Sequence, residues 1–347
     1  MTKFIKNYLI FIIKSLTVIF IISLIGITLS TLNDRSGKMN GTTKLVIRNL
    51  THNYYSIQKN IIHNIYSKIE SRNTIKNNTD HHKKENDKVF VMKFYGGTQA
   101  REIDLLKNEI TAVLSVANKG DKVVLILESP GGTVNGYGLA ASELERIRTK
   151  GINLTILVDK VAASGGYMMA VIGNEIIAAP FAIIGSIGVL AEMPNFSERL
   201  QREGIKYEQI MSGKYKKNIN MFGKNTEEGR KKMQEDLNMI HSTFIELVKN
   251  KRPNINIQKI ATGEFWLATQ AKKLGLIDKI MTSEDYLTSL YADNKKVFLV
   301  QYEKESSLVS KVLNTFNVLY KLFNQTHISM AKQENSFNFM KSIHSIN

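Results

Sequence analysis

From Val89 onward the sequence alternates between short apolar runs and stretches with helical periodicity. Helices are predicted at residues 103–116 and 136–150, with Gly151 ending the second. Four apolar runs flanking these helices have the length of a strand: residues 89–94, 123–127, 154–158 and 175–179. Strands that are apolar on both faces and joined by helices indicate a parallel sheet covered by helices. The sequence therefore predicts an α/β fold that begins at Val89.

An uncharged apolar stretch, Ser15 to Leu32, lies near the start of the chain. Its 18 residues are enough for one membrane span, and the apolar part of a cleaved signal peptide is usually shorter. We therefore expect residues 1–32 to be an uncleaved anchor in the lipid bilayer. Basic residues flank the stretch on both sides, so charge alone leaves its orientation open.

The positive charge is concentrated near this anchor. More than half of the formal net charge of +16 lies in residues 1–88, which favours contact with anionic lipid over a nucleic-acid-binding face on the folded domain. Residues 33–88 are predicted to form a polar basic linker with one helix, because apolar residues recur at helical spacing after Leu50. His81 and His82 lie in a polar run, where histidines are usually solvated, so no metal site is predicted.

Residues 286–347 are predicted to add a C-terminal strand and a helical tail. Apolar residues recur at helical spacing from Leu308 to Phe323, with lysines among them. Packing of this amphipathic helix on the domain or on a neighbouring subunit is the favoured interpretation, and contact with the bilayer is the alternative. The expected organisation is thus an anchor, a linker, a domain over residues 89–285 and this C-terminal segment.

Three glycine-containing loops follow strands, at the edge where α/β folds bind ligands. The first, residues 128–132, offers bare backbone amides that suit an oxyanion hole. In the second, Ser164 is flanked only by small residues and begins a helix, which exposes its hydroxyl. The third places Ser186 in a tight turn between glycines. Each loop alone is a weak signal of a functional site. The chain has no Cys, so disulfides and thiolate nucleophiles are excluded.

A serine nucleophile needs a base, and His241 is the only histidine within residues 89–304. Its apolar neighbours at helical spacing indicate a packing role, so a Ser/His/Asp triad is not predicted. Lysine is the remaining candidate, within residues 212–217, although such a run is ordinarily a solvated basic turn. A lysine acts as a base only in its neutral form, which burial and a neighbouring hydroxyl such as Ser186 promote.

Several ordered motifs extend this pattern along the chain. They are LESPGG from Leu127, NGYGLAAS from Asn135, VDKVAASGGYMMA from Val158, APFAIIGSIGV from Ala179, MPNF from Met193, NTEEGR from Asn225, RPNI from Arg252 and ATGEFW from Ala261. Together they resemble the signal peptide peptidase A, or protease IV, family, and most closely its single-span branch, the SohB-like peptidases. The resemblance implies a crotonase-like fold with a repeated ββα core, related to the proteolytic subunit of the Clp protease. It also implies a Ser/Lys peptidase that needs no cofactor.

The same resemblance implies which residues form the catalytic dyad. Ser164 matches the family nucleophile in an Ala-Ser-Gly-Gly motif. Lys216 matches the general base, because it occupies the last position of the motif Ser-Gly-x-x-Lys. Lys214 and Lys217 lie so close in the sequence that either remains an alternative to Lys216.

Further roles follow from the resemblance. Gly132 matches an amide that lines the oxyanion hole, and Gly165 is expected to supply a second amide. Ser186 matches a serine that hydrogen-bonds the catalytic lysine. The family also implies a bacterial inner-membrane protein with one span and its peptidase domain in the periplasm.

We therefore expect a membrane-anchored serine endopeptidase that forms a homo-oligomer and hydrolyses membrane-derived peptides such as signal-peptide remnants. Its expected partners are peptide substrates and the bilayer, and no nucleic acid. The alternatives are a crotonase-like acyl-thioester enzyme and a catalytically silent membrane scaffold. Only the peptidase depends on the hydroxyl of Ser164 and on a neutral lysine.

Overall fold

The computed structural model describes most of one domain and a few residues before it. The described residues are 43–65 and 87–304, with Tyr8, Lys14, Ser15, Thr17, Phe20 and Ile21. Leu45–Tyr302 form one compact unit, and the fold below is that of this unit. Most of the expected span and the whole expected tail helix lie outside the described residues. Within the described part, no helix is both long and apolar enough to cross a membrane.

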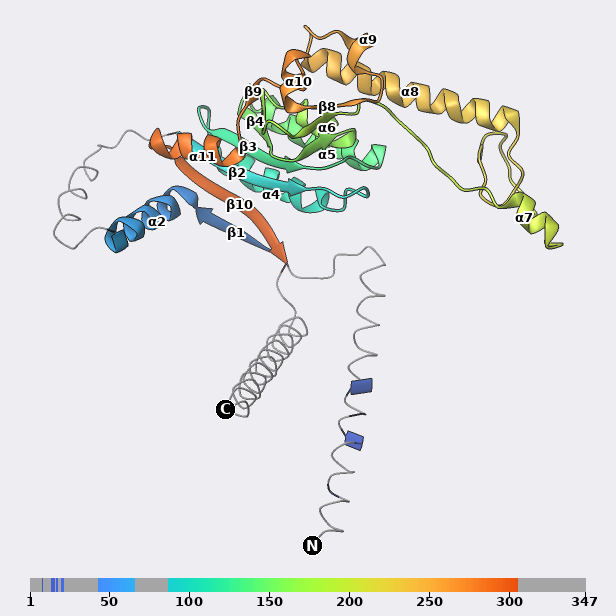
Figure 1. Ribbon diagram of the computed structural model, residues 1–347, viewed down its shortest axis with the longest axis horizontal. Coiled ribbons are helices and arrows are strands. Elements are labelled where there is room, and N and C mark those ends of the chain that lie inside the picture. The colour runs from blue at the N-terminus through green and yellow to red at the C-terminus, as the bar shows by residue number, and fades with distance from the viewer. Residues whose placement is uncertain are drawn as a thin grey trace, which may run out of the picture. The chain divides into compact units, whose positions relative to one another are not determined.

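The core of the domain is a seven-stranded sheet in the order β1-β10-β2-β3-β4-β6-β9 (Figure 1). All the pairs from β10 to β9 are parallel. The strands are β1 (Thr43–Asn49), β2 (Lys88–Tyr95), β3 (Lys122–Glu128), β4 (Asn153–Val158), β6 (Glu175–Ala178), β9 (Lys279–Ile280) and β10 (Lys296–Lys304). The predicted α/β class is confirmed, and β2, β3, β4 and β6 lie within two residues of their predicted bounds.

Helices cover both faces of this sheet. The described residues contain the helices α2 (Leu50–Ile65), α4 (Ile103–Val116), α5 (Val134–Thr149), α6 (Gly165–Ala170), α7 (Ser197–Arg202), α8 (Glu227–Lys251), α9 (Ile257–Ile260), α10 (Ala268–Lys273) and α11 (Ser283–Ala292), and α7 is the one that lies away from the sheet (Figure 1). Alternate residues of β2 enter separate cores: Met92 packs in the cluster that includes α4 and α5, and Val91 packs in the cluster that includes α11. Because side chains alternate along a strand, a sheet covered on both faces needs strands that are apolar throughout.

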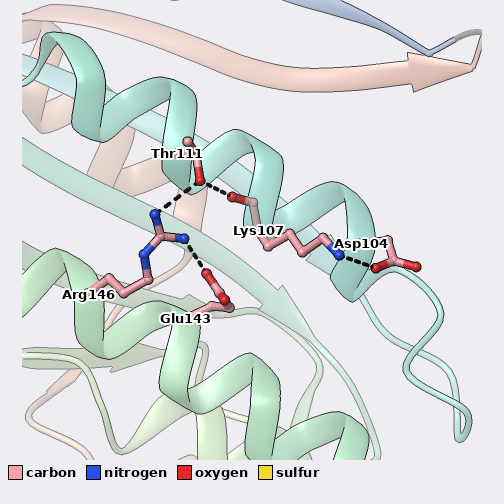
Figure 2. A network of polar contacts seen from close by, with 5 residues as sticks. All are labelled: Asp104, Lys107, Thr111, Glu143 and Arg146. Atoms are coloured by element: carbon pink, nitrogen blue, oxygen red, sulfur yellow. Dashed lines mark hydrogen bonds and ion pairs between the residues drawn. The ribbon is translucent and has the colours of Figure 1, made fainter.

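The neighbouring helices α4 and α5 also share a polar network on their surface (Figure 2). Arg146 donates to the hydroxyl of Thr111 at 3.1 Å and pairs with Glu143. On α4, Lys107 contacts Asp104 at 2.7 Å. Exposed pairs of this kind contribute about 0–1 kcal/mol each. The buried apolar faces below the network therefore account for most of the packing energy between these helices.

A second sheet of three strands positions the predicted site. It contains β5 (Val161–Ala163), β7 (Ile183–Gly185) and β8 (Phe265–Leu267), with β5 and β7 parallel and β8 antiparallel to β7. An isolated bridge between Ser129 and Ala162 joins it to the end of β3. Since β5 ends directly before Ser164 and β7 ends directly before Ser186, both serines leave the same small sheet at neighbouring strand ends.

Part of the segment expected to be a linker belongs to the domain. Residues 43–65 form the edge strand β1 and the helix α2, and α2 agrees with the helical spacing seen in the sequence. Tyr54 of α2 stacks on Tyr291 at 4.7 Å, and Thr51 accepts a hydrogen bond from the backbone N–H of Val297 at 2.9 Å. The folded domain therefore starts before Val89, because β1 adds to a sheet edge formed by β10 far along the chain.

Candidate active site

Ser164 occupies the turn between β5 and α6 in a strained backbone conformation. Its φ of 51° and ψ of −120° are uncommon for a residue with a Cβ. Its backbone N–H donates to the carbonyl of Gly185 at 2.8 Å, and its own carbonyl accepts from Met168 at 2.9 Å. A strained turn from strand to helix is the geometry that exposes a nucleophilic serine in other hydrolases. The half-buried Ser164 thus has the backbone expected of a nucleophile.

Backbone amides approach Ser164 closely because three neighbouring residues are glycines. A Cβ on Gly131 would lie 2.6 Å from the amide nitrogen of Gly165. A Cβ on Gly132 would lie 1.9 Å from the carbonyl oxygen of Thr98. Within the described residues, the N–H groups of Gly132 and Gly165 donate to no other group. These two amides are therefore free to bind a developing oxyanion.

The three loops predicted from the sequence meet at one cavity of about 1170 Å³. The structure brings together four of the predicted site residues in its lining: Gly132, Ser164, Gly165 and Ser186. They come from three turns, which follow the C-terminal ends of β3, β5 and β7, and Ser164 and Gly165 share the turn after β5. This convergence is the placement that parallel strands favour for ligand chemistry.

Ser186 is fixed by the third strand of the small sheet. Like Ser164, it has a positive φ, of 52°, and its N–H donates to the carbonyl of Glu264 at 2.7 Å. The ring of Trp266 packs against the preceding Gly185, where a Cβ would lie 2.8 Å from the ring. The ATGEFW motif therefore supports the loop that holds Ser186.

Lys216 does not lie at this cavity. It is exposed, and its backbone N–H donates to Gly213 at 3.1 Å. Lys214 pairs with Glu228 at 2.5 Å, and Lys217 is exposed. All three lysines belong to residues 189–226, here called the arm, which leads through α7 to the N-terminal end of α8 (Figure 1). The structure thus brings the predicted nucleophile and the predicted oxyanion-hole amides to one cavity but leaves the predicted base outside it.

His241, which the sequence analysis assigned to packing, lines the same cavity. Its Nε2 lies 3.2 Å from the carbonyl oxygen of Ile187, in the loop that holds Ser186. The neighbouring Phe244 is buried, as the helical spacing indicates. No local pattern shows that α8 crosses the third loop, so only the fold reveals that His241 faces the cavity.

The far end of α8 is anchored to the main sheet. Arg252 donates to both carboxylate oxygens of Asp278, at 2.6 and 2.8 Å, and Asp278 also accepts from Ile176 at 2.7 Å. Burial raises the pKa of Asp278, but the hydrogen bonds from Arg252 and Ile176 outweigh it and hold that pKa below its usual value. Arg252 of the RPNI motif therefore fixes the C-terminal end of α8, the helix that forms one wall of the cavity.

Two further residues at the site were not singled out in the sequence analysis, although both lie in the quoted motifs. Ser129 and Tyr137 are fully buried, and their hydroxyl oxygens lie 2.5 Å apart. Burial raises the pKa of Tyr137 above its usual value despite this hydrogen bond, so the phenol stays protonated near neutral pH. Within the described residues, no cluster of three or more metal-ligating side chains is present.

Comparison with known proteins matches both halves of the chain to one family. The model for Peptidase family S49 N-terminal matches residues 3–144, and that for Peptidase family S49 matches residues 146–297. The probable protease SohB of Buchnera aphidicola subsp. Schizaphis graminum is 39% identical over 341 residues, covering 93% of this chain and 98% of that protein. The probable protease SohB of Haemophilus influenzae is 46% identical over 223 residues, covering 64% of this chain and 63% of that protein.

Among solved structures, a mutant of the 1510-N membrane-bound stomatin-specific protease in complex with a substrate peptide is 18% identical, with a TM-score of 0.39. The alignment covers 59% of this chain and 80% of that one. The family matches and the long alignments to SohB proteases carry the assignment. The chain belongs to peptidase family S49 and is a serine peptidase.

Proposed function

We propose that the protein is a membrane-anchored endopeptidase in which Ser164 is the nucleophile and Lys216 is the general base. The observation that carries this proposal is the strained position of Ser164 beside the unpaired amides of Gly132 and Gly165. Family membership supports a serine peptidase, and the Ser-Gly-x-x-Lys register supports Lys216. Peptide hydrolysis by the full chain, compared with the Ser164→Ala variant, is the direct test.

In the proposed reaction, Oγ of Ser164 attacks the peptide carbonyl while Nζ of Lys216 accepts the hydroxyl proton. The N–H groups of Gly132 and Gly165 stabilise the oxyanion. The lysine then passes its proton to the leaving amine, and water hydrolyses the acyl-enzyme by the same route. These steps involve no cofactor, and Ser186 orients the lysine.

We further propose that Lys216 reaches the site in an assembly of several copies of the chain. The arm exposes an unusual set of large apolar side chains: Leu190, Met193, Phe196, Ile205, Tyr207, Ile210, Met211, Tyr215 and Phe222. Ile210 is 98% exposed. Many large exposed apolar side chains on one segment are typical of a protein interface. Docking of the arm on a second copy buries this surface and carries the lysines towards that copy's cavity.

The proposed substrates are peptides with large apolar side chains. A groove of about 440 Å³ shares Val134, Met168, Ile240 and Phe244 with the cavity of Ser164. Lys251 and Glu145, which contact each other at 2.6 Å, also line this groove. An apolar pocket adjoining a reactive centre selects apolar side chains. Such peptides are abundant where membrane proteins and signal peptides are degraded, which fits an anchored enzyme.

The substitution Gly138→Leu is expected to change substrate preference without damaging the fold. Gly138 lines the groove from α5, and a Cβ there meets nothing within 4 Å. The leucine side chain therefore occupies the groove, and replacing a helical glycine favours the helix by up to about 1 kcal/mol. For peptides with a large apolar side chain at the preferred position, kcat/KM should fall about 10-fold or more, and for alanine-containing peptides it should stay within about twofold.

The matched control is Asn135→Leu, which adds the same side chain to the same helix at an exposed position outside the groove. It should leave both classes of peptide unaffected. Equal losses for large and small side chains in Gly138→Leu would show that the groove does not select the substrate.

We propose that the apolar stretch Ser15 to Leu32 anchors the chain in the membrane, and extraction from membranes tests this. The full chain is expected to stay in the membrane pellet after alkaline carbonate extraction, and a chain lacking residues 1–32 is expected to be released. In spheroplasts, external protease should digest the domain, because we place it on the periplasmic side. Protection of the domain while a periplasmic control is digested would reverse the proposed orientation.

A further inference from the structure

Ser129 connects the nucleophile strand to the glycine loop. Its N–H donates to Val161 at 2.9 Å, and its carbonyl accepts from Ala163 at 3.1 Å, so its backbone holds β5 directly before Ser164. Its side-chain oxygen accepts a hydrogen bond from the N–H of Gly131 at 3.1 Å. One fully buried residue therefore sets the position of the glycine loop relative to the nucleophile.

Tyr137 lies under the same loops. Its ring packs against Gly165, where a Cβ would lie 2.4 Å from Cγ of the ring. Its hydroxyl donates to the carbonyl of Gly97 at 2.8 Å and contacts the hydroxyl of Ser129 at 2.5 Å. The side chain thus touches the turn after β2, the turn after β3 and the first residue of α6.

Only one assignment of donors and acceptors satisfies this network. The phenol has a single proton, which it gives to the carbonyl of Gly97, so Ser129 must donate its own proton to the phenol oxygen. The oxygen of Ser129 remains free to accept from the N–H of Gly131. The result is a chain of three hydrogen bonds from Gly131 through Ser129 and Tyr137 to Gly97, with every buried donor and acceptor in it satisfied.

We propose that Tyr137, acting with Ser129, is a positioning residue that holds the amides of the oxyanion hole at the distance from Ser164 that the reaction requires. This inference rests on the proposed function, because it assigns a role relative to the Ser164 nucleophile. The hydroxyl of Tyr137 fixes the loop containing Gly132 through Ser129, and its ring fixes Gly165. Neither residue contacts the reacting atoms.

The hydroxyl of Tyr137 acts on kcat rather than on substrate affinity. The substrate carbonyl is bound before the oxyanion forms, and misplaced amides weaken mainly the interaction with the developing charge. The substitution Tyr137→Phe keeps the ring against Gly165 and removes only the hydroxyl. We expect kcat of the full chain to fall about 10- to 100-fold while KM stays within about twofold.

A peptide aldehyde gives a second readout, because its adduct with Ser164 places an oxyanion against the same amides. Its inhibition constant should rise by about the same factor as kcat falls. The variant Ser129→Ala should reproduce both changes, and the double variant should lose less than the product of the single losses, because both hydroxyls act through one chain of hydrogen bonds. If Tyr137→Phe does not fold, Ser129→Ala provides the same test.

Tyr167→Phe is the matched control. Tyr167 is also fully buried, and its hydroxyl donates to the carbonyl of Leu276 at 2.9 Å, away from the glycine loop. Both phenylalanine variants lose one buried hydroxyl group. If Tyr137 had a purely structural role, the two variants should lose similar thermal stability, and kcat should not fall selectively in Tyr137→Phe. Equal kcat in the two variants, or strictly multiplicative losses in the double variant, would overturn the proposal. An active Ser164→Ala enzyme would instead overturn the proposed function on which it rests.

Discussion

Replacing Ser164 by alanine is expected to lower the rate of peptide hydrolysis by at least about 10⁴-fold, because no other group can form the acyl-enzyme. The fold should persist. Serine and alanine both carry a Cβ, so the strain at a φ of 51° is the same in both, and only one oxygen is removed. The measurement is steady-state hydrolysis of an apolar peptide by the purified full chain, with thermal unfolding recorded in parallel.

The control for this change is Ser289→Ala, an exposed serine on α11 whose hydroxyl donates to the carbonyl of Tyr286. It should keep wild-type activity. Hydrolysis that survives in Ser164→Ala would remove this serine from its role. Turnover of an acyl-thioester by both the wild type and Ser164→Ala, without peptide hydrolysis, would identify an acyl-thioester enzyme that uses the glycine amides alone. A wild-type chain that binds peptides without turnover would be a scaffold.

A second large loss is expected for Lys216→Ala, of at least about 10³-fold in kcat, because the hydroxyl of Ser164 is a weak nucleophile without a base. Lys214→Ala and Lys217→Ala are the matched controls within the same loop. Lys214 pairs with Glu228 rather than facing a site, so we expect both controls to retain most of the activity.

Mixing the two inactive variants tests whether the dyad forms between copies. The Lys216→Ala chain keeps Ser164, and the Ser164→Ala chain keeps Lys216. If the dyad forms between chains, some sites in a mixed assembly therefore contain both groups. Random assembly should then restore about a quarter of the wild-type rate. No recovery in mixed assemblies would show that both residues of the dyad come from one chain.

His241 is the competing base, because the structure places it at the cavity and does not place Lys216 there. The substitution His241→Gln should leave most of the peptide hydrolysis in place. An active Lys216→Ala enzyme, together with an inactive His241→Gln enzyme, would assign the base to the histidine.

Local patterns in the sequence were sufficient to predict several helices and strands and the loops that carry Ser164 and Ser186. The helix expected at residues 103–116 is α4, with the same bounds. It could be predicted because the residues that pack on the sheet recur at helical spacing. The three glycine loops were recognised because close backbone approach and positive φ need glycine at Gly131 and Gly185. Helical periodicity and the need for glycine at positive φ depend on residues close in sequence, so short stretches of sequence are enough to detect them.

Contacts between distant segments were decided only by the tertiary structure. Nothing local in residues 43–49 indicates that they pair beside β10, and nothing local in α8 indicates that His241 faces the loop of Ser186. The hydrogen bonds from Tyr137 to Ser129 and Gly97 join separate turns, so they exist only after the sheet has formed. Lys216 lies on the arm, which exposes many large apolar side chains, and contacts within one copy leave this lysine outside the cavity of Ser164. Sequence therefore determined which residues can do the chemistry, and the packing of distant segments decided which of them meet.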